Sequence, residues 1–248
     1  KGRSVTTPTY ETVVLEARDG ARFSAYTVRA AKPIGAGMVI LPGGRGLLPV
    51  YAELADRFAE AGIDAVAIDH FGRSADLGMR DDQFEFAPHL AKTSSEYTKQ
   101  DVAAALEYLR SGTGARVRAV FTIGFSFGGA ASFLQAGHLE HRLAGAIGCY
   151  GWPLGSTDFP QWPKPIEQVA QYRCAVLAIF GGADERSSEG EAKQFNAALG
   201  QAGIEHWMVR CDGAPHGFSD RRGKEFPVQA QAAWQRVLDF VSGLTSPV

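Results

Sequence analysis

The chain contains 248 residues, of which 45% are hydrophobic and 21% are charged, and its formal net charge is −2. This composition is typical of a folded globular protein and argues against extended disorder. The 25 basic and 27 acidic residues nearly balance, so no basic excess predicts a nucleic-acid partner.

Neither a membrane-spanning apolar run nor a signal peptide is visible in the sequence. We therefore expect a cytoplasmic protein without a membrane partner, as a monomer or homodimer. The chain begins with Lys1 and not with Met, which leaves a removed leader open. The cysteines Cys149, Cys174 and Cys211 are too few for a disulfide framework and form no zinc-binding pair, so we expect buried reduced thiols.

The first predicted elements form a β-hairpin. Residues Thr12–Glu16 and Phe23–Val28 are rich in strand-forming side chains and flank the turn sequence Arg18-Asp19-Gly20. Further along, short apolar runs alternate with segments of helical periodicity. Several of these runs are continuous, as in strands that are buried on both faces. The predicted strands are Met38–Leu41, Ala65–Ile68, Val117–Ile123, Leu143–Cys149, Ala175–Phe180 and His206–Val209.

Apolar side chains recur every three or four residues within 51–61, 102–109 and 230–244, which predicts helices there. The alternation of strand and helix predicts an α/β protein with a doubly wound, mostly parallel sheet and an antiparallel N-terminal hairpin at one edge. We expect a single domain over residues 1–248.

Two connections, 71–93 and 152–165, are longer than the others. Both follow the carboxyl ends of predicted strands, where open α/β sheets build ligand sites. We interpret them as pocket walls or lids, with plain surface loops as the alternative.

The strongest local motif is Gly124-Phe125-Ser126-Phe127-Gly128, between a predicted strand and a predicted helix. In such a strand–turn–helix context, a Gly-x-Ser-x-Gly sequence forms a tight turn that presents the serine as a nucleophile. The glycines are needed because a Cβ would collide with the neighbouring strand or helix. The N–H of Phe127 is then placed to stabilise an oxyanion.

A serine nucleophile needs a base, and that base needs an orienting acid. Asp184 and His216 each follow the end of a predicted strand, at the same sheet edge as Ser126, so we predict a triad of these three. Glu185 and Asp212 are weaker candidates for the acid. His138, His141 and His206 are weaker candidates for the base, because they lie at a helix end or at the wrong end of a strand.

The second oxyanion donor is expected on the glycine-rich loop after Met38–Leu41. That loop reads Pro42-Gly43-Gly44-Arg45-Gly46. Gly44 is the first candidate and Arg45 the second.

Together with Cys149-Tyr150-Gly151, Gly181-Gly182-Ala183-Asp184 and Pro215-His216-Gly217-Phe218, the serine motif resembles the dienelactone hydrolase family of the α/β-hydrolase fold. The resemblance spans nearly the whole chain. It implies the α/β-hydrolase fold and hydrolysis of small esters or lactones without metal or cofactor.

The chain departs from the family pattern at two places. Well-known members carry a cysteine where Ser126 stands, and a glutamate near the position of Gly43. A thiol can be held as a thiolate, whereas a serine needs a base during attack, so the two changes together favour a Ser-His-Asp mechanism.

Substrate recognition also departs from that pattern. Arg73 matches the first of two arginines that bind a substrate carboxylate in the family, whereas Asp220 takes the place of the second, with Arg221 one position beyond. An acid there would repel a carboxylate, which disfavours dienelactone itself. The alternative for Arg73 is a purely structural role. The aromatic residues Tyr150, Trp152 and Trp162 are expected either to line the pocket or to pack the core.

The sequence therefore predicts a serine hydrolase that cleaves small-molecule carboxylic esters or lactones through an acyl-enzyme. Two alternatives stay open. One is a serine peptidase or acyltransferase on the same fold, and the other is a non-catalytic homologue that binds a small ligand in the same pocket.

Overall fold

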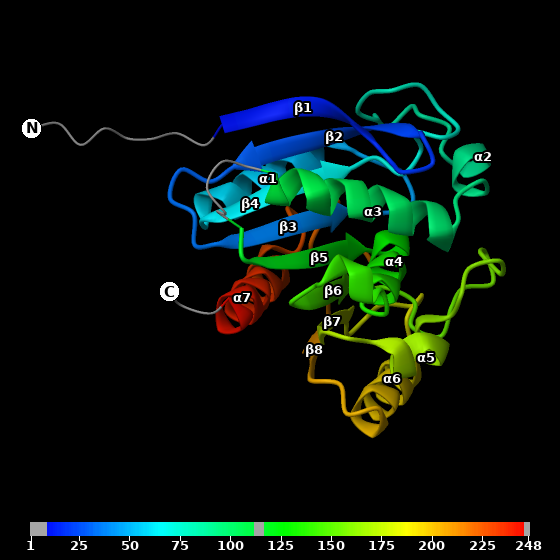
Figure 1. Cartoon of the computed structure of the whole chain (residues 1–248). Helices are drawn as coiled ribbons and strands as arrows, with labels where there is room; N and C mark the ends of the chain where they lie inside the picture. Colours follow the sequence, from blue (N-terminus) through cyan, green and yellow to red (C-terminus); the bar gives the residue numbers. More distant parts are fainter. Residues whose placement is uncertain (1–8, 112–116, 246–248) are drawn as a thin grey trace, which may run out of the picture.

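The computed structural model describes residues 9–111 and 117–245, and the side chains from residue 11 onward. The predicted single domain over 1–248 therefore includes residues outside this description. Within the described residues, eight strands form one sheet with helices on both faces (Figure 1).

The strands follow the order β1-β2-β4-β3-β5-β6-β7-β8 across the sheet. β2 pairs antiparallel with β1 and with β4, and all other neighbours are parallel. This arrangement confirms the predicted α/β fold with an antiparallel N-terminal hairpin. The bounds are β1 Thr9–Glu16, β2 Arg22–Arg29, β3 Ala36–Leu41, β4 Ile63–Ile68, β5 Ala119–Phe125, β6 Gly145–Cys149, β7 Ala175–Gly181 and β8 His206–Cys211.

The helices cover both faces of the sheet (Figure 1). α1 and α7 pack their apolar sides against one face, whereas α3, α4 and α6 pack against the other. The bounds are α1 Pro49–Glu60, α2 Ala87–Leu90, α3 Ser95–Arg110, α4 Phe127–Gln135, α5 Pro165–Gln168, α6 Glu189–Gln201 and α7 Pro227–Leu244, with short 3₁₀ helices at Leu139–His141 and Val169–Gln171.

Burial on both faces explains the unbroken apolar runs of the central strands. All residues of β3, β4, β6 and β7 are buried. β8 lies at an edge and is mostly half-exposed, and Trp207 on it is 44% exposed. The carboxyl ends of the parallel strands therefore meet at one rim of a rigid layer, which is where the loops that carry the candidate site residues begin.

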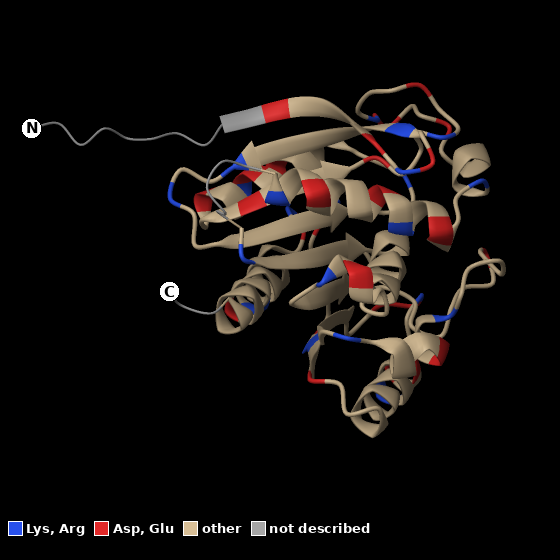
Figure 2. Cartoon of the chain, in the orientation of Figure 1, with Lys and Arg blue, Asp and Glu red and all other residues tan. Residues whose placement is uncertain are grey.

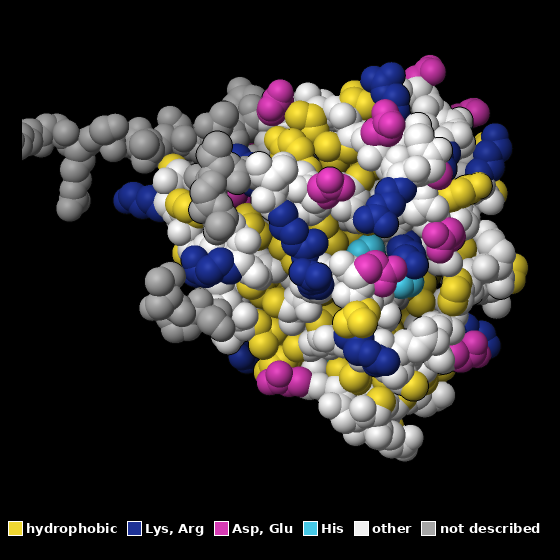
Figure 3. Space-filling model, viewed as in Figure 1, with side chains coloured by type: hydrophobic (Ala, Val, Ile, Leu, Met, Phe, Trp, Pro, Cys, Tyr) yellow, Lys and Arg dark blue, Asp and Glu magenta, His cyan; other side chains and the backbone are white. Residues whose placement is uncertain are grey.

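Charged residues of both signs are interspersed over the helices and loops in view (Figures 2 and 3). Within residues 9–111 and 117–245, no helix has the length and apolar character needed to cross a membrane.

Candidate active site

Ser126 occupies the tight turn between β5 and α4. Its backbone has φ 54° and ψ −114°, a conformation that residues with a side chain rarely adopt. The turn leaves no space around it, because a Cβ on Gly124 would collide with the carbonyl of Gly128. The N–H of Ser126 donates to the carbonyl of Cys149 at 3.0 Å, which ties the turn to β6. The hydroxyl is thereby held at the rim of the sheet and at the N-terminus of α4.

The imidazole of His216 lies within hydrogen-bonding distance of both other side chains of the predicted triad. The Nε2 atom of His216 is 2.8 Å from the Oγ atom of Ser126. Its Nδ1 atom is 2.9 Å from Oδ2 of Asp184. A carboxylate only accepts hydrogen bonds, so Nδ1 carries the proton and Nε2 is free to accept the serine proton.

Asp184 and His216 differ in exposure, in the way that their predicted roles require. The carboxylate of Asp184 has no solvent exposure, and the backbone N–H of Arg186 donates to its second oxygen at 2.8 Å. The imidazole of His216 is 22% exposed, so substrate and water can reach it. The two weaker candidates for the acid have other surroundings, since Glu185 is exposed and Asp212 pairs with Arg210 at 3.2 Å.

The two predicted oxyanion donors, Phe127 and Gly44, lie side by side. A Cβ built on Gly44 would be 3.9 Å from the Cβ atom of Phe127 and 3.0 Å from Cδ2 of Leu90. Within the described part of the chain, neither backbone N–H donates to a protein acceptor. Both groups are therefore left to bind a ligand oxygen next to Ser126.

A cavity of about 540 Å³ opens over the serine. Both long connections contribute to its wall, with Phe86 and Leu90 from 71–93 and with Trp152 and Phe159 from 152–165. Charged side chains complete the lining, namely Arg45, Asp158, Arg186, Asp220, Arg221, Arg222 and Glu225. The cavity thus combines an aromatic wall with a charged rim.

The structure places two of the three expected substrate-binding residues in this cavity. Tyr150 and Trp152 both line it. Arg73 lies outside it, because its guanidinium is held by Asp101, at 2.6 and 2.8 Å, and by Asp19, at 3.0 Å. Those carboxylates belong to α3 and to the turn of the N-terminal hairpin, so Arg73 joins these two elements. Trp162 packs edge-on against Phe127 but is not part of the cavity lining.

A network around Asp220 was not predicted from the sequence. One carboxylate oxygen accepts a hydrogen bond from the hydroxyl of Tyr51, and the other accepts one from the hydroxyl of Tyr150, both at 2.8 Å. Burial raises the pKa of Asp220, while the hydrogen bonds from Tyr150 and Tyr51 lower it. Tyr51 occurs at core spacing on α1, so nothing in its periodicity indicates this role.

The family model for the dienelactone hydrolase family matches residues 23–244, which include every residue of the predicted triad. The chain belongs to the dienelactone hydrolase family. A relative from Escherichia coli O157:H7, named "Putative carboxymethylenebutenolidase", is 24% identical over 76% of this chain and 69% of its own length. One of the same name from Methylorubrum extorquens is 27% identical over 74% of this chain and 64% of its own length.

A solved structure titled "Putative Dienelactone Hydrolase", from Klebsiella pneumoniae, superimposes with a TM-score of 0.80. It is 21% identical and covers 96% of this chain and 99% of its own. This structural similarity agrees with the α/β fold described above.

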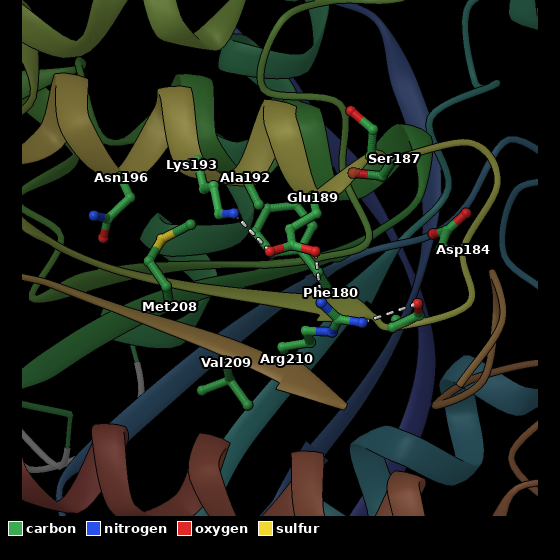
Figure 4. A pocket seen from close by; sticks show the side chains of 13 residues that line it. Phe180, Asp184, Ser187, Glu189, Ala192, Lys193, Asn196, Met208, Val209 and Arg210 are labelled. Atoms are coloured by element: carbon green, nitrogen blue, oxygen red, sulfur yellow. Dashed lines mark hydrogen bonds and ion pairs between the residues drawn. The ribbon is translucent and has the colours of Figure 1, made fainter. Parts of the chain in front are cut away.

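A second cavity of about 490 Å³ is lined by residues of α6 and β8 and also by Asp184 (Figure 4). Both of its cations are paired, because Glu189 contacts Lys193 at 2.7 Å and Arg210 at 2.8 Å. In the described part of the chain, no group of three His, Cys, Asp or Glu side chains is placed to hold a metal ion.

Proposed function

We propose that this dienelactone hydrolase family member hydrolyses carboxylic esters or lactones through an acyl-enzyme on Ser126. The observation that carries the proposal is the pair of contacts made by His216, at 2.8 Å to Ser126 and at 2.9 Å to Asp184. The two contacts connect nucleophile, base and orienting acid in one line, as acyl transfer through a serine requires.

The first half of the reaction forms the acyl-enzyme. The Oγ atom of Ser126 attacks the carbonyl carbon while its proton passes to Nε2 of His216. Asp184 stabilises the imidazolium that results. The backbone N–H groups of Phe127 and Gly44 bind the oxyanion, and a single donor of this kind is worth about 10²- to 10³-fold in rate in other enzymes. Collapse of the intermediate breaks the bond to the alcohol oxygen, which takes the proton from His216.

The second half releases the acid. Water replaces the alcohol, gives a proton to His216 and attacks the acyl carbonyl, and Ser126 leaves with that proton. In a lactone the alcohol stays attached to the acyl chain, so the product is a hydroxy acid. The chain's own residues suffice for both halves.

Two features support esters and lactones as the substrate class. The names of the E. coli and M. extorquens relatives refer to a lactone hydrolase. The cavity of about 540 Å³ has the size of a small-molecule site, and its aromatic wall suits an apolar acyl or alcohol group.

The test is a substrate panel with wild-type protein and Ser126→Ala. We expect the wild type to hydrolyse aryl esters and a lactone, and we expect Ser126→Ala to lose this turnover while its thermal unfolding stays unchanged. A fluorophosphonate should label the wild type and Ser187→Ala but not Ser126→Ala. Ser187 is the control because it is a buried serine that lines the second cavity.

Three results would contradict the proposal. Full turnover in Ser126→Ala would exclude Ser126 as the nucleophile. Turnover of amides in place of esters would favour a peptidase. Absence of labelling and of turnover in the wild type would indicate a binding protein.

A further inference from the structure

The loop that carries Gly44 is held by a buried phenol. The hydroxyl of Tyr51, which is 1% exposed, accepts a hydrogen bond from the N–H of Gly43 at 2.8 Å. The carbonyl of Gly43 accepts one from the N–H of Gly46 at 3.0 Å. Both polar groups of Gly43 are therefore fixed.

The orientation of the Gly44 N–H follows from these two bonds. The peptide between Gly43 and Gly44 is planar and trans, so the N–H of Gly44 points opposite to the carbonyl of Gly43. Because that carbonyl is turned towards Gly46, the N–H of Gly44 is turned away from the loop. Gly44 borders the cavity, so a rotation of this one peptide would remove the predicted second oxyanion donor.

The phenol of Tyr51 has a fixed orientation of its own. It donates to Oδ2 of Asp220 at 2.8 Å, and Oδ1 of Asp220 accepts from Tyr150 at 2.8 Å. Burial, together with the nearby charge of Asp220, raises the pKa values of Tyr51 and Tyr150 well above the ordinary tyrosine value. Both phenols therefore keep their protons and donate them. The remaining lone pairs of the Tyr51 oxygen are thus turned to the N–H of Gly43.

The same network reaches the catalytic base. Asp220 lies four residues after His216 on the loop between β8 and α7. The ring of Tyr150 lies edge-on to the imidazole of His216, with ring centroids 5.1 Å apart. The carboxylate of Asp220 thus connects three parts of the chain. Through Tyr51 it reaches the loop that carries Gly43, it binds Tyr150, which follows β6, and it lies on the same loop as His216.

We infer that Tyr51 and Asp220 are positioning residues that hold the Gly43–Gly44 peptide, and with it the second oxyanion donor, in register with Ser126 and His216. This inference rests on the proposed function, because it assigns these side chains to the same site. Both side chains border the cavity, but neither touches the reacting atoms in this assignment, so the effect that we assign to them is on the turnover step.

The first test is kinetic. Tyr51→Phe keeps the ring but removes the acceptor of the Gly43 N–H, and Asp220→Asn presents an N–H₂ to one of the two phenols. We expect each change to lower kcat by at least about 10-fold while KM changes less than about 2-fold, because an oxyanion donor acts in the transition state. Tyr172→Phe is the matched control, because it also removes a buried phenol, one that donates to Pro165 at 3.2 Å on the opposite face of the sheet.

A second kinetic readout separates positioning from a general structural effect. Sulfur accepts hydrogen bonds poorly, so a thionoester gains little from the oxyanion donors. The ratio of kcat/KM for an ester to that for the matching thionoester should fall at least about 5-fold in Tyr51→Phe and stay unchanged in Tyr172→Phe. A lower kcat with an unchanged ratio would overturn the inference.

The third test does not depend on turnover. Hydrogen exchange of the backbone amides in residues 43–47 should be at least about 10-fold faster in Tyr51→Phe and in Asp220→Asn than in the wild type or in Tyr172→Phe. Unchanged exchange would overturn the inference even if activity falls. If exchange is faster in the variants but the wild type cleaves no ester, the proposed function is contradicted. That result would still show that Tyr51 and Asp220 hold the loop of Gly43 in place.

Discussion

The indole of Trp152 lies parallel to the imidazole of His216, with 6° between the ring planes and 6.3 Å between the ring centroids. Phe159 continues this stack, with its centroid 5.9 Å from that of Trp152. Trp152 is 8% exposed and borders the cavity. The predicted catalytic base is therefore flanked by a flat apolar wall that a planar substrate group can also contact.

Replacement of Trp152 by leucine should reduce kcat/KM for aryl esters by about 10-fold or more, and for short aliphatic esters by less. The reason is that an aryl group loses a stacking partner worth about 1 kcal/mol together with buried apolar area. Trp207→Leu, on the exposed edge strand β8, is the control. Equal losses for both ester types would show that Trp152 supports His216 without contacting the substrate.

Asp184→Asn should lower kcat by about 10³- to 10⁴-fold with little change in KM. The amide would keep its oxygen on the N–H of Arg186, which now donates to Asp184, and would turn its N–H₂ towards Nδ1 of His216. Nδ1 would then have to accept, Nε2 would carry the proton, and the imidazole could no longer accept the proton of Ser126. Steady-state kinetics on one aryl ester measures the loss.

Glu185→Gln is the matched control for this change, because Glu185 is adjacent in sequence but exposed. We expect it to stay within about 2-fold of wild type, as surface changes usually do. A large loss in Glu185→Gln, with a small one in Asp184→Asn, would transfer the role of the acid to Glu185.

Arg73→Met should destabilise the fold and leave KM unchanged. The guanidinium of Arg73 makes two hydrogen bonds to Asp101, whose side chain is 2% exposed. Burial raises the pKa of Asp101 to about 6, against the opposing effect of Arg73. Without the arginine a buried carboxylate would lose its partner, which costs about 3 kcal/mol of unfolding free energy.

Urea denaturation at neutral pH measures this loss, and the double variant Arg73→Met with Asp101→Leu should recover part of it, because it removes the unpaired charge. A raised KM for an anionic ester, with unchanged unfolding free energy, would instead support the substrate-binding role expected from the family resemblance.

The sheet could be predicted from the sequence because its strands are buried on both faces and therefore read as unbroken apolar runs. The three triad positions could be predicted for a related reason. Each lies at the end of a strand or on the loop that follows it, and the carboxyl ends of parallel strands meet at one rim. α6 was not among the predicted helices, because only Phe195 and Leu199 of its thirteen residues are buried and its apolar periodicity is weak.

The contacts of Arg73 and of Asp220 could not be predicted. Arg73 finds its partners on the turn of the hairpin and on α3, and that pairing depends on how the hairpin lies against the helix. Asp220 meets Tyr51, which is 169 positions away, across the rim of the sheet. Periodicity reports which face of an element is buried, but it does not report which polar atoms meet there.

The buried imidazole of His70 should make stability depend on pH. It follows β4, its Nε2 atom has no hydrogen-bond partner within the described residues, and burial lowers its pKa to about 4. In the unfolded chain the pKa of histidine is about 6.5. At pH values between these two pKa values, His70 is protonated in the unfolded chain and neutral in the folded chain. The unfolding free energy therefore falls as the pH falls from about 6.5 to about 4.

The full effect of His70 is about 3 kcal/mol, and His141, whose pKa burial also lowers to about 4, adds a similar amount. His70→Phe keeps an aromatic ring against Phe71, whose ring centroid is 4.3 Å away. Protonation of Asp101, whose pKa burial raises to about 6, acts in the opposite direction in both proteins. Urea unfolding measured at several pH values should therefore show that the unfolding free energy of this variant falls by about 3 kcal/mol less than that of wild type between about pH 6.5 and about pH 4. If wild type and His70→Phe show the same slope, the imidazole of His70 takes up its proton as easily in the folded chain as in the unfolded one.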